Sequence, residues 1–186
     1  MPTHSFALQW YAAFGDALPA GFLCRRALAD RWLRVHSLPL SKRYAEIEAE
    51  RSELLHRQNA VASYVLGEGA DCVAFVTRFG QSTDCALPEG LPLGLPEPEC
   101  VLSVNDDDNE IHIFALPVVW HEDSFNEIIL AAADDRTGPL LFANLQRGSA
   151  YAPYDGGADL FFPSTNAASS ARARFRPWLS TREDGL

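Results

Sequence analysis

The segment RVHSLPLSKRY, residues 34–44, holds the densest group of side chains able to bind a charged ligand. Its pattern predicts a strand end followed by a helix N-terminus. Guanidinium groups beside a helix N-terminus can hold a carboxylate or a phosphate, and a histidine can titrate near neutral pH. The alternative is that these cations pair with the glutamates of residues 46–50 or with acids elsewhere in the fold. The candidate binding residues here are Arg34, His36, Lys42 and Arg43.

A second polar group lies in YAPYDGGADLFF, residues 151–162. Asp155 precedes two glycines, a strong turn signal because glycine adopts positive φ without steric cost. Asp159 follows in a strand-like run, where an inward-facing aspartate needs a cation such as an arginine of residues 31–43. Two carboxylates can also divide general acid and base roles, although a structural turn and salt bridge is the alternative. We expect the turn to bring its carboxylates against the arginine-bearing strand in one polar centre. The candidate binding residues here are Tyr154, Asp155 and Asp159.

The other motifs complete no metal or nucleotide site. The acidic run NDDDNE, residues 105–110, lacks the glycine and glutamate that an EF-hand loop requires, so we expect a solvated hairpin tip. The five histidines show no metal-binding spacing, and the chain has no Walker, dinucleotide-binding or nucleophile-elbow motif. No C-x-x-C pair is present, so we expect free, buried thiols in a reducing compartment. The sequence predicts no metal and no cofactor. The four cysteines are Cys24, Cys72, Cys85 and Cys100.

Hydrophobic periodicity predicts the elements that position these groups. The run RWLRVHSL, residues 31–38, alternates like a strand with Leu33 and Val35 on its apolar face. The longest helix is expected over residues 43–66, with Ser41 as its cap and Ile47 in its apolar stripe. Three further helices are expected over residues 5–14, after a cap at Asp123 or Ser124, and over residues 166–179.

The remaining apolar runs predict strands joined by short turns. Residues 72–79 read as a buried strand, and residues 100–120 and 139–155 each read as a hairpin. Strands joined by short turns pair antiparallel. We therefore expect a single α+β domain over residues 1–186, with a mostly antiparallel sheet of about six to seven strands packed with four helices. The Pro/Gly-rich residues 80–99 are expected to form a surface loop.

Charge is distributed unevenly along the chain. Residues 1–59 carry eight Lys/Arg and six Asp/Glu, whereas residues 68–135 carry fifteen acids and one base, Arg78. With a net charge of −10, the protein is expected to favour a basic protein partner over nucleic acid or an anionic membrane. The chain also lacks a signal-peptide pattern and an apolar run of about 20 residues, so a soluble cytoplasmic protein is expected. The oligomeric state is left open.

The residues Pro153, Tyr154, Asp155, Gly157 and Asp159, followed by Phe175 and Trp178-Leu179, resemble a bacterial family of unknown function. Its members carry a PYDDRGMD-type hairpin and then a helix with an aromatic residue and Trp-Leu. This chain departs from the pattern in its turn, where no cation stands in the place of the family's arginine. The run YDGGADLFF is also similar to a hairpin of immunity proteins related to SMI1/KNR4.

These observations favour a non-enzymatic protein-binding module, in the form of an immunity-type protein that neutralises a basic partner. The compact length, the acidic segment and the missing catalytic motifs point in that direction. The alternative is a small enzyme or ligand-binding domain that uses the Arg/His/Asp polar site. That alternative requires the candidate residues to line one pocket with Tyr154 at its wall.

Overall fold

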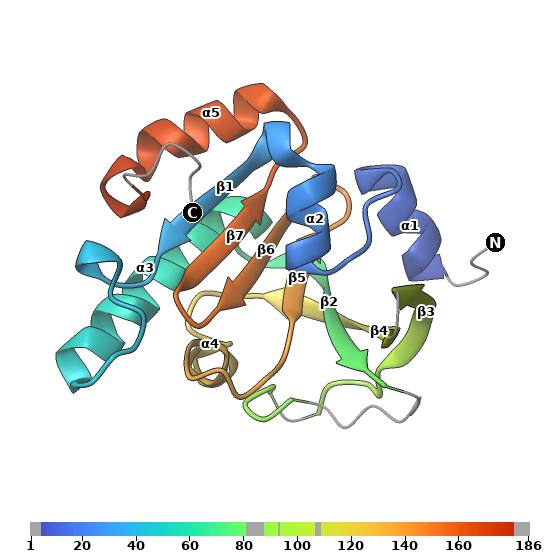
Figure 1. Ribbon diagram of the computed structural model, residues 1–186, viewed down its shortest axis with the longest axis horizontal. Coiled ribbons are helices and arrows are strands. Elements are labelled where there is room, and N and C mark those ends of the chain that lie inside the picture. Colours follow the sequence, from blue (N-terminus) through green and yellow to red (C-terminus); the bar gives the residue numbers. More distant parts are fainter. Residues whose placement is uncertain (1–4, 81–87, 93, 107–108, 181–186) are drawn as a thin grey trace.

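The computed structural model describes residues 5–80, 88–92, 94–106 and 109–180, and its centre is one antiparallel sheet (Figure 1). The strand order is β1-β7-β6-β5-β2-β4-β3, with seven strands. The strands are β1 (Trp32–His36), β2 (Ala70–Phe79), β3 (Glu99–Asp106), β4 (Asn109–Trp120), β5 (Leu140–Asn144), β6 (Ser149–Tyr154) and β7 (Gly157–Phe161). The α-helices of the described residues are α1 (Ser5–Phe14), α2 (Gly21–Ala27), α3 (Glu48–Leu66), α4 (Asn126–Ala133) and α5 (Thr165–Arg174).

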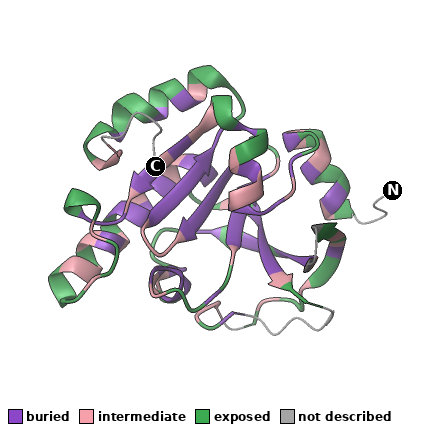
Figure 2. Ribbon diagram, viewed as in Figure 1, coloured by how far each residue is buried: buried purple, intermediate pink, exposed green. Residues whose placement is uncertain are grey.

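The helices cover the two faces of the sheet unequally, and each face has its own apolar core. The larger core joins α3, α4 and α5 to one face and includes Trp120 and Phe142. The smaller core joins α1 and α2 to the other face and includes Trp10 and Phe75. Figure 2 shows the central strands buried between these layers, while the outer surfaces of α3 and α5 are exposed. The expected α+β fold with a mostly antiparallel sheet is therefore confirmed.

The predicted strands and hairpins occur in the structure. In β1 the burial alternates as expected, with Leu33 and Val35 on the buried face and the polar residues half-buried. The hairpins β3–β4 and β5–β6 pair antiparallel, and the turn after Tyr154 leads into β7. The tip of the acidic hairpin, residues 107–108, lies outside the described residues. No helix in the described part of the chain combines the length and apolarity needed to cross a membrane.

The long helix begins five residues later than predicted. A 3₁₀ turn at Pro39–Ser41 and an irregular stretch precede α3, and Ile47 occupies the N-cap position with no side-chain cap. The prediction that Ile47 belongs to the apolar stripe is wrong, because its side chain is 59% exposed. Leu40 and Ser41 have left-handed backbones, with φ of 56° each, so Ser41 does not cap the helix. Residues 39–47, here called the β1–α3 loop, are a mostly exposed segment that precedes α3.

Other departures concern helix number and helix ends. The described residues form five α-helices instead of the expected four, because α2 was not predicted from the segment after Pro19. Phe125, not Asp123 or Ser124, stands at the N-cap of α4. The last helix ends at Arg174 and continues as a 3₁₀ turn that leaves Trp178 half-buried. The thiol expectation holds for two cysteines, but Cys100 is exposed and Cys85 lies outside the described residues.

The described parts of the Pro/Gly-rich segment contain no helix or strand before β3. Residues 81–87 and 93 lie outside the described residues. Leu91 and Leu95 pack against the larger core, so this segment also covers part of the apolar interior. At Gly90 the backbone comes so close to α4 that a Cβ would stand 2.7 Å from the carbonyl carbon of Glu127.

The double glycine after Asp155 is explained by close packing rather than by positive φ. Neither Gly156 nor Gly157 has a left-handed backbone, which corrects the reason drawn from the sequence. A Cβ on Gly157 would stand 2.0 Å from the carbonyl oxygen of Val35 in the neighbouring strand. At Gly156 the nearest atom would be a ring carbon of Tyr154, at 3.2 Å. The β1–β7 pairing thus requires glycine at 157 and tolerates a small side chain at 156.

We expect Gly157→Ala to destabilise the protein by at least about 3 kcal/mol, because two paired backbones would have to separate. Gly156→Ala is the matched control and should cost under about 1 kcal/mol, since only a ring must shift. Thermal unfolding of both variants measures the difference, at about 2–4 °C per kcal/mol for a chain of this size. Equal melting temperatures would contradict the close approach.

Candidate functional site

The β1–β7 pairing places Arg34 directly opposite Asp159 on one face of the sheet. Two parallel hydrogen bonds join them: Arg34 Nε donates to Asp159 Oδ1 at 2.8 Å and Nη2 donates to Oδ2 at 2.9 Å. Trp32 Nε1 donates a third hydrogen bond to Oδ1 at 2.9 Å. The Asp159 side chain is 6% exposed and that of Arg34 14%. This is a buried, bidentate ion pair, the geometry in which arginine binds carboxylates most strongly.

Aromatic rings hold the Arg34 guanidinium in place. Its central carbon lies 4.7 Å from the centre of the Tyr154 ring and 5.5 Å from that of Trp32. Such cation–π contacts strengthen when water is excluded. Burial raises the pKa of Tyr154 to about 12, so its hydroxyl stays protonated at neutral pH and can donate a hydrogen bond. Tyr154 therefore forms a wall of the polar centre, as the sequence predicted.

Asp155 is held from the other side by the β1–α3 loop. The guanidinium of Arg43 forms an ion pair with Asp155 Oδ2, and the hydroxyl of Tyr44 donates to the same oxygen at 3.0 Å. The hydrogen bond to Asp155, aided by its charge, raises the pKa of Tyr44 above its ordinary value. Arg43 and Asp155 are candidate binding residues of the sequence analysis, whereas Tyr44 belongs to the same polar segment but not to the candidate set. The loop is thus tied to the β6–β7 turn by one shared carboxylate oxygen.

Lys42 and His36 stand apart from this centre. Lys42 Nζ contacts Glu50 Oε1 at 2.7 Å and Glu46 Oε2 at 3.2 Å, so this cation pairs with the glutamates of its own segment. His36 lies opposite Gly157, on the same sheet face as Asp159. Burial, assisted by the charge of Arg34, lowers the pKa of His36. Its Nε2 is buried and has no hydrogen-bond partner among the described residues.

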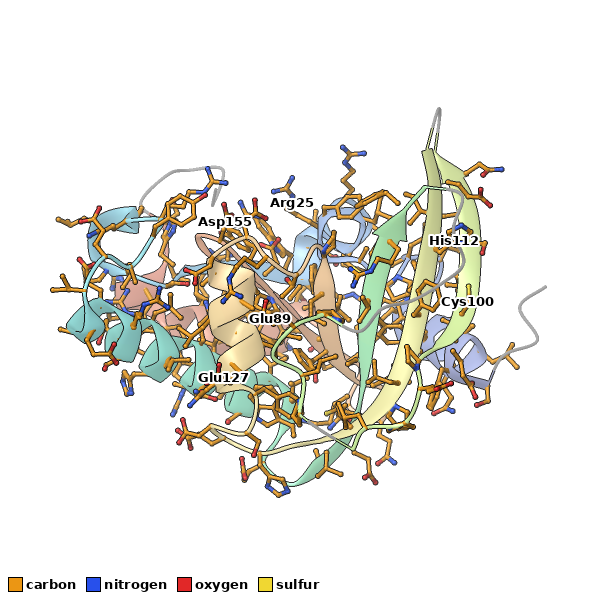
Figure 3. All side chains as sticks on the ribbon, turned by 90° about the horizontal axis from the view of Figure 1, so that it is seen from below. Arg25, Glu89, Cys100, His112, Glu127 and Asp155 are labelled. Carbon is orange, nitrogen blue, oxygen red and sulfur yellow. The ribbon has the colours of Figure 1, made fainter. Side chains whose placement is uncertain are left out.

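Four of the seven predicted binding residues line one pocket of about 260 Å³. The pocket lies between α2, the β6–β7 turn and the segment that joins α4 to β5. Arg25 from α2 and Asp155 from the turn lie on the same side of the molecule (Figure 3). His36, Lys42 and Arg43 do not line it. The charged and phenolic residues of the lining are Arg25, Arg34, Asp135, Tyr154, Asp155 and Asp159.

Sequence reasoning missed Arg25, Asp135 and the apolar wall residue Phe22. Arg25 and Phe22 belong to α2, which the sequence pattern did not reveal. Asp135 lies one residue beyond the C-cap of α4 and has a left-handed backbone, with φ of 57°. An exposed aspartate just after an alanine-rich helix end was a weak signal, since aspartate tolerates this conformation better than most residues.

The pocket can bind charge, but its described residues offer little nucleophilic or metal chemistry. The thiol of Cys24 on α2 is buried, which raises its pKa to about 12. A thiol with that pKa is not a thiolate at neutral pH. Among the described residues, no three histidine, cysteine or acidic side chains are grouped to hold a metal ion. The pocket presents two guanidinium groups, a phenol and three carboxylates beside apolar walls.

Comparison with known proteins identifies the family. The model of a family described as a domain of unknown function, DUF3885, matches residues 20–183. The chain belongs to this family. The matched span includes every residue that lines the pocket and leaves out α1. No curated protein and no solved structure matches the chain.

We expect Asp159→Ala to cost about 3–5 kcal/mol of stability, because it leaves the Arg34 guanidinium buried without its partner. The exposed Asp30, which has no side-chain hydrogen bond or ion pair among the described residues, supplies the matched control. Asp30→Ala should stay within about ±0.5 kcal/mol. Asp107, a natural control at the acidic hairpin tip, lies outside the described residues. Urea unfolding of both variants measures the difference, and similar midpoints would show that the pair contributes little.

Proposed function

We propose that this chain is a non-enzymatic protein-binding module that recognises a basic partner through the β1–α3 loop and the acidic surface beside it. The observation that carries the proposal is the exposure of three large apolar side chains on one short loop. Leu40 is 102% exposed, Ile47 59% and Tyr44 45%. Six large apolar residues are exposed in the described part of the chain, and half of them lie within these eight positions.

Exposed apolar residues that cluster are typical of protein interaction sites, whereas single ones need no explanation. The loop also keeps two consecutive non-glycine residues, Leu40 and Ser41, in a left-handed backbone. Each such residue costs of the order of 1–3 kcal/mol, and this strain is concentrated at functional segments. The ties from Arg43 and Tyr44 to Asp155 fix the loop, so a partner would meet a preformed surface.

The surroundings of the loop favour a basic partner. Arg51 and Arg136 each form an ion pair with Asp134 at the end of α4, and the exposed Asp135 follows Asp134. Figure 3 shows Glu89 and Glu127 on the same side of the molecule as Asp155. Residues 121–135, which include α4, carry five acids and no Lys or Arg. An acidic field of this kind accelerates association with a cationic protein, and salt weakens that effect.

An immunity-type protein is the specific form we propose: a bacterial, cytoplasmic chain that neutralises a basic enzyme such as a nuclease. Tight inhibitors of this kind use charge to raise the association rate and apolar anchors to slow dissociation. The β1–α3 loop supplies the anchors and the α4 side supplies the charge. The proposal gives no role in binding nucleic acid or membranes, because the net charge of −10 disfavours anionic partners.

Binding of a small ligand is the second candidate function. The observation that favours it is the meeting of Arg34, Tyr154, Asp155 and Asp159 in one pocket. A largely apolar pocket with a few convergent polar groups is the usual form of a small-molecule site. The two functions use adjoining but different surfaces.

The protein-binding function is tested by capture from a bacterial lysate at low salt on three immobilised proteins: wild type, the double variant Leu40→Ser/Ile47→Ser, and Leu8→Ser. Leu8 is 55% exposed on α1 and controls for the general loss of apolar surface. We expect wild type and Leu8→Ser to retain the same basic protein, and the double variant to lose at least about 90% of it, because buried apolar anchors dominate interface energy.

An inhibition assay with the purified partner then tests whether the protein is of the immunity type. We expect wild type to inhibit the enzymatic activity of the partner at equal molar ratio, with an affinity that falls steeply between about 50 and 500 mM salt. Retention of the same proteins by the double variant and wild type would contradict the proposed surface. A captured partner that is acidic, or whose binding ignores salt, would contradict the proposed partner class.

A further inference from the structure

Two of the three carboxylates in the pocket are already neutralised by cations of the protein. Asp159 is paired with Arg34, and Asp155 is paired with Arg43, which stands outside the pocket. Two charged lining residues are left, Arg25 and Asp135. Among the described residues, neither side chain makes a hydrogen bond or ion pair. The described part of the pocket therefore offers a ligand one unpaired cation, Arg25, and one unpaired anion, Asp135.

These two open charges belong to different sides of the pocket. Arg25 comes from α2, and its charge acts on the hydroxyl of Tyr154. Asp135 follows α4, and its charge acts on Arg43 and Tyr44 of the β1–α3 loop. A molecule in the pocket would thus meet the positive group at the α2 side and the negative group at the loop side.

Further unpaired donors lie on the cationic side. Arg34 uses Nε and Nη2 on Asp159, and within the described residues its Nη1 makes no hydrogen bond. The Tyr154 hydroxyl also has no hydrogen-bond partner there, and its raised pKa keeps it a donor. A carboxylate held by Arg25 would therefore find additional donors within the same wall.

The remaining walls are apolar, and the space is small. Phe22, Ala132, Pro139, Leu140 and Ala152 supply most of the lining between the charged groups. The volume of about 260 Å³ lies below the roughly 300–1,000 Å³ of pockets for drug-sized ligands. A small molecule with an apolar part and both charges fits this combination.

We propose that the pocket binds a free α-amino acid with an apolar side chain. Its carboxylate pairs with Arg25 and receives the Arg34 Nη1 and Tyr154 donors, its ammonium group pairs with Asp135, and its side chain contacts Phe22. Neither charge of the ligand is left unpaired, which is what makes a zwitterion preferable to a simple acid or amine. This inference rests on the second candidate function, small-ligand binding, and shares Asp135 with the acidic side of the protein-binding surface.

The test is isothermal titration calorimetry of the full chain with three related probes: L-leucine, L-leucinamide and 4-methylpentanoate. Leucinamide keeps the ammonium group and lacks the carboxylate, and 4-methylpentanoate keeps the carboxylate and lacks the ammonium group. We expect leucine to bind at least about tenfold more tightly than either analogue, because hydrogen bonds to charged groups are the strong ones. Leucine should also raise the melting temperature, and the rise should keep growing with the logarithm of its concentration above Kd.

Three variants locate the binding. Arg25→Gln and Asp135→Asn should each weaken leucine binding at least about tenfold. Arg26→Gln is the matched control, because Arg26 is the exposed neighbour of Arg25 on α2 and does not line the pocket. It should leave the affinity within about twofold. Arg25 and Asp135 make no side-chain bonds within the described residues, so these variants are expected to fold like wild type.

The results distinguish failure of the amino-acid assignment from failure of small-ligand binding in general. Equal or tighter binding of 4-methylpentanoate or leucinamide would overturn the zwitterion assignment and leave small-ligand binding standing. No binding of any probe at 10 mM would overturn the amino-acid assignment, and a wider ligand screen without any hit would then remove the second candidate function. Leucine binding that Arg25→Gln and Asp135→Asn leave unchanged would place the ligand elsewhere and overturn the site.

Discussion

The buried pair of Arg34 and Asp159 is the interaction on which the rest of this site depends. It joins the edge strand β1 to β7 through side chains as well as through the backbone, with both carboxylate oxygens occupied. Trp32 donates a second hydrogen bond to Oδ1, so the carboxylate accepts three hydrogen bonds from side chains of β1. A charge pair of this burial is weak evidence for stability as such, because desolvation offsets its attraction. Its value here is that it fixes where the guanidinium and the aromatic rings lie.

The geometry of the site follows from that fixed point. The guanidinium of Arg34 stacks over the ring of Tyr154. Tyr154 is the last residue of β6 and directly precedes Asp155 in the turn. Asp155 in turn holds the β1–α3 loop through Arg43 and Tyr44. The close approach of Gly157 to Val35 gives the strand spacing that this chain of contacts needs. One pocket and one exposed loop are thereby organised around a single pair of strands.

Much of this arrangement could be predicted from the sequence, because it rests on local signals. The alternation of residues 31–38 and the Asp-Gly-Gly turn predict two strands, and an aspartate within a strand predicts a cationic partner. Those signals led to Arg34, Tyr154, Asp155 and Asp159, which the structure brings together. Whether they bind a ligand stays a prediction. The resemblance at the C-terminal hairpin led to a family of unknown function, and membership of one is confirmed.

The parts of the fold and site that the sequence did not predict depend on tertiary contacts, which produce no hydrophobic periodicity in the sequence. The helix α2 has only seven residues and no side-chain cap, so Arg25 and Phe22 could not be assigned to the site. Residues 43–47 of the β1–α3 loop are predicted as helix because Ile47 extends the apolar stripe of α3, yet that side chain is 59% exposed. Lys42 and Arg43 are adjacent in sequence but pair with different acids. Lys42 pairs with Glu50 on α3, and Arg43 pairs with Asp155 in the β6–β7 turn. Which acid each of these two cations pairs with depends on the folded backbone and cannot be predicted from their positions in the sequence.

The central claim, that Arg34 and Asp159 act as one unit, is tested most directly by a double-mutant cycle. The free energy of unfolding is measured in urea for wild type, Arg34→Met, Asp159→Leu and the double variant. We predict a coupling energy of about 2–3 kcal/mol, because each single variant leaves a buried charge that the double variant does not. Additive effects, within about 0.5 kcal/mol, would contradict the claim and leave the site without its organising contact.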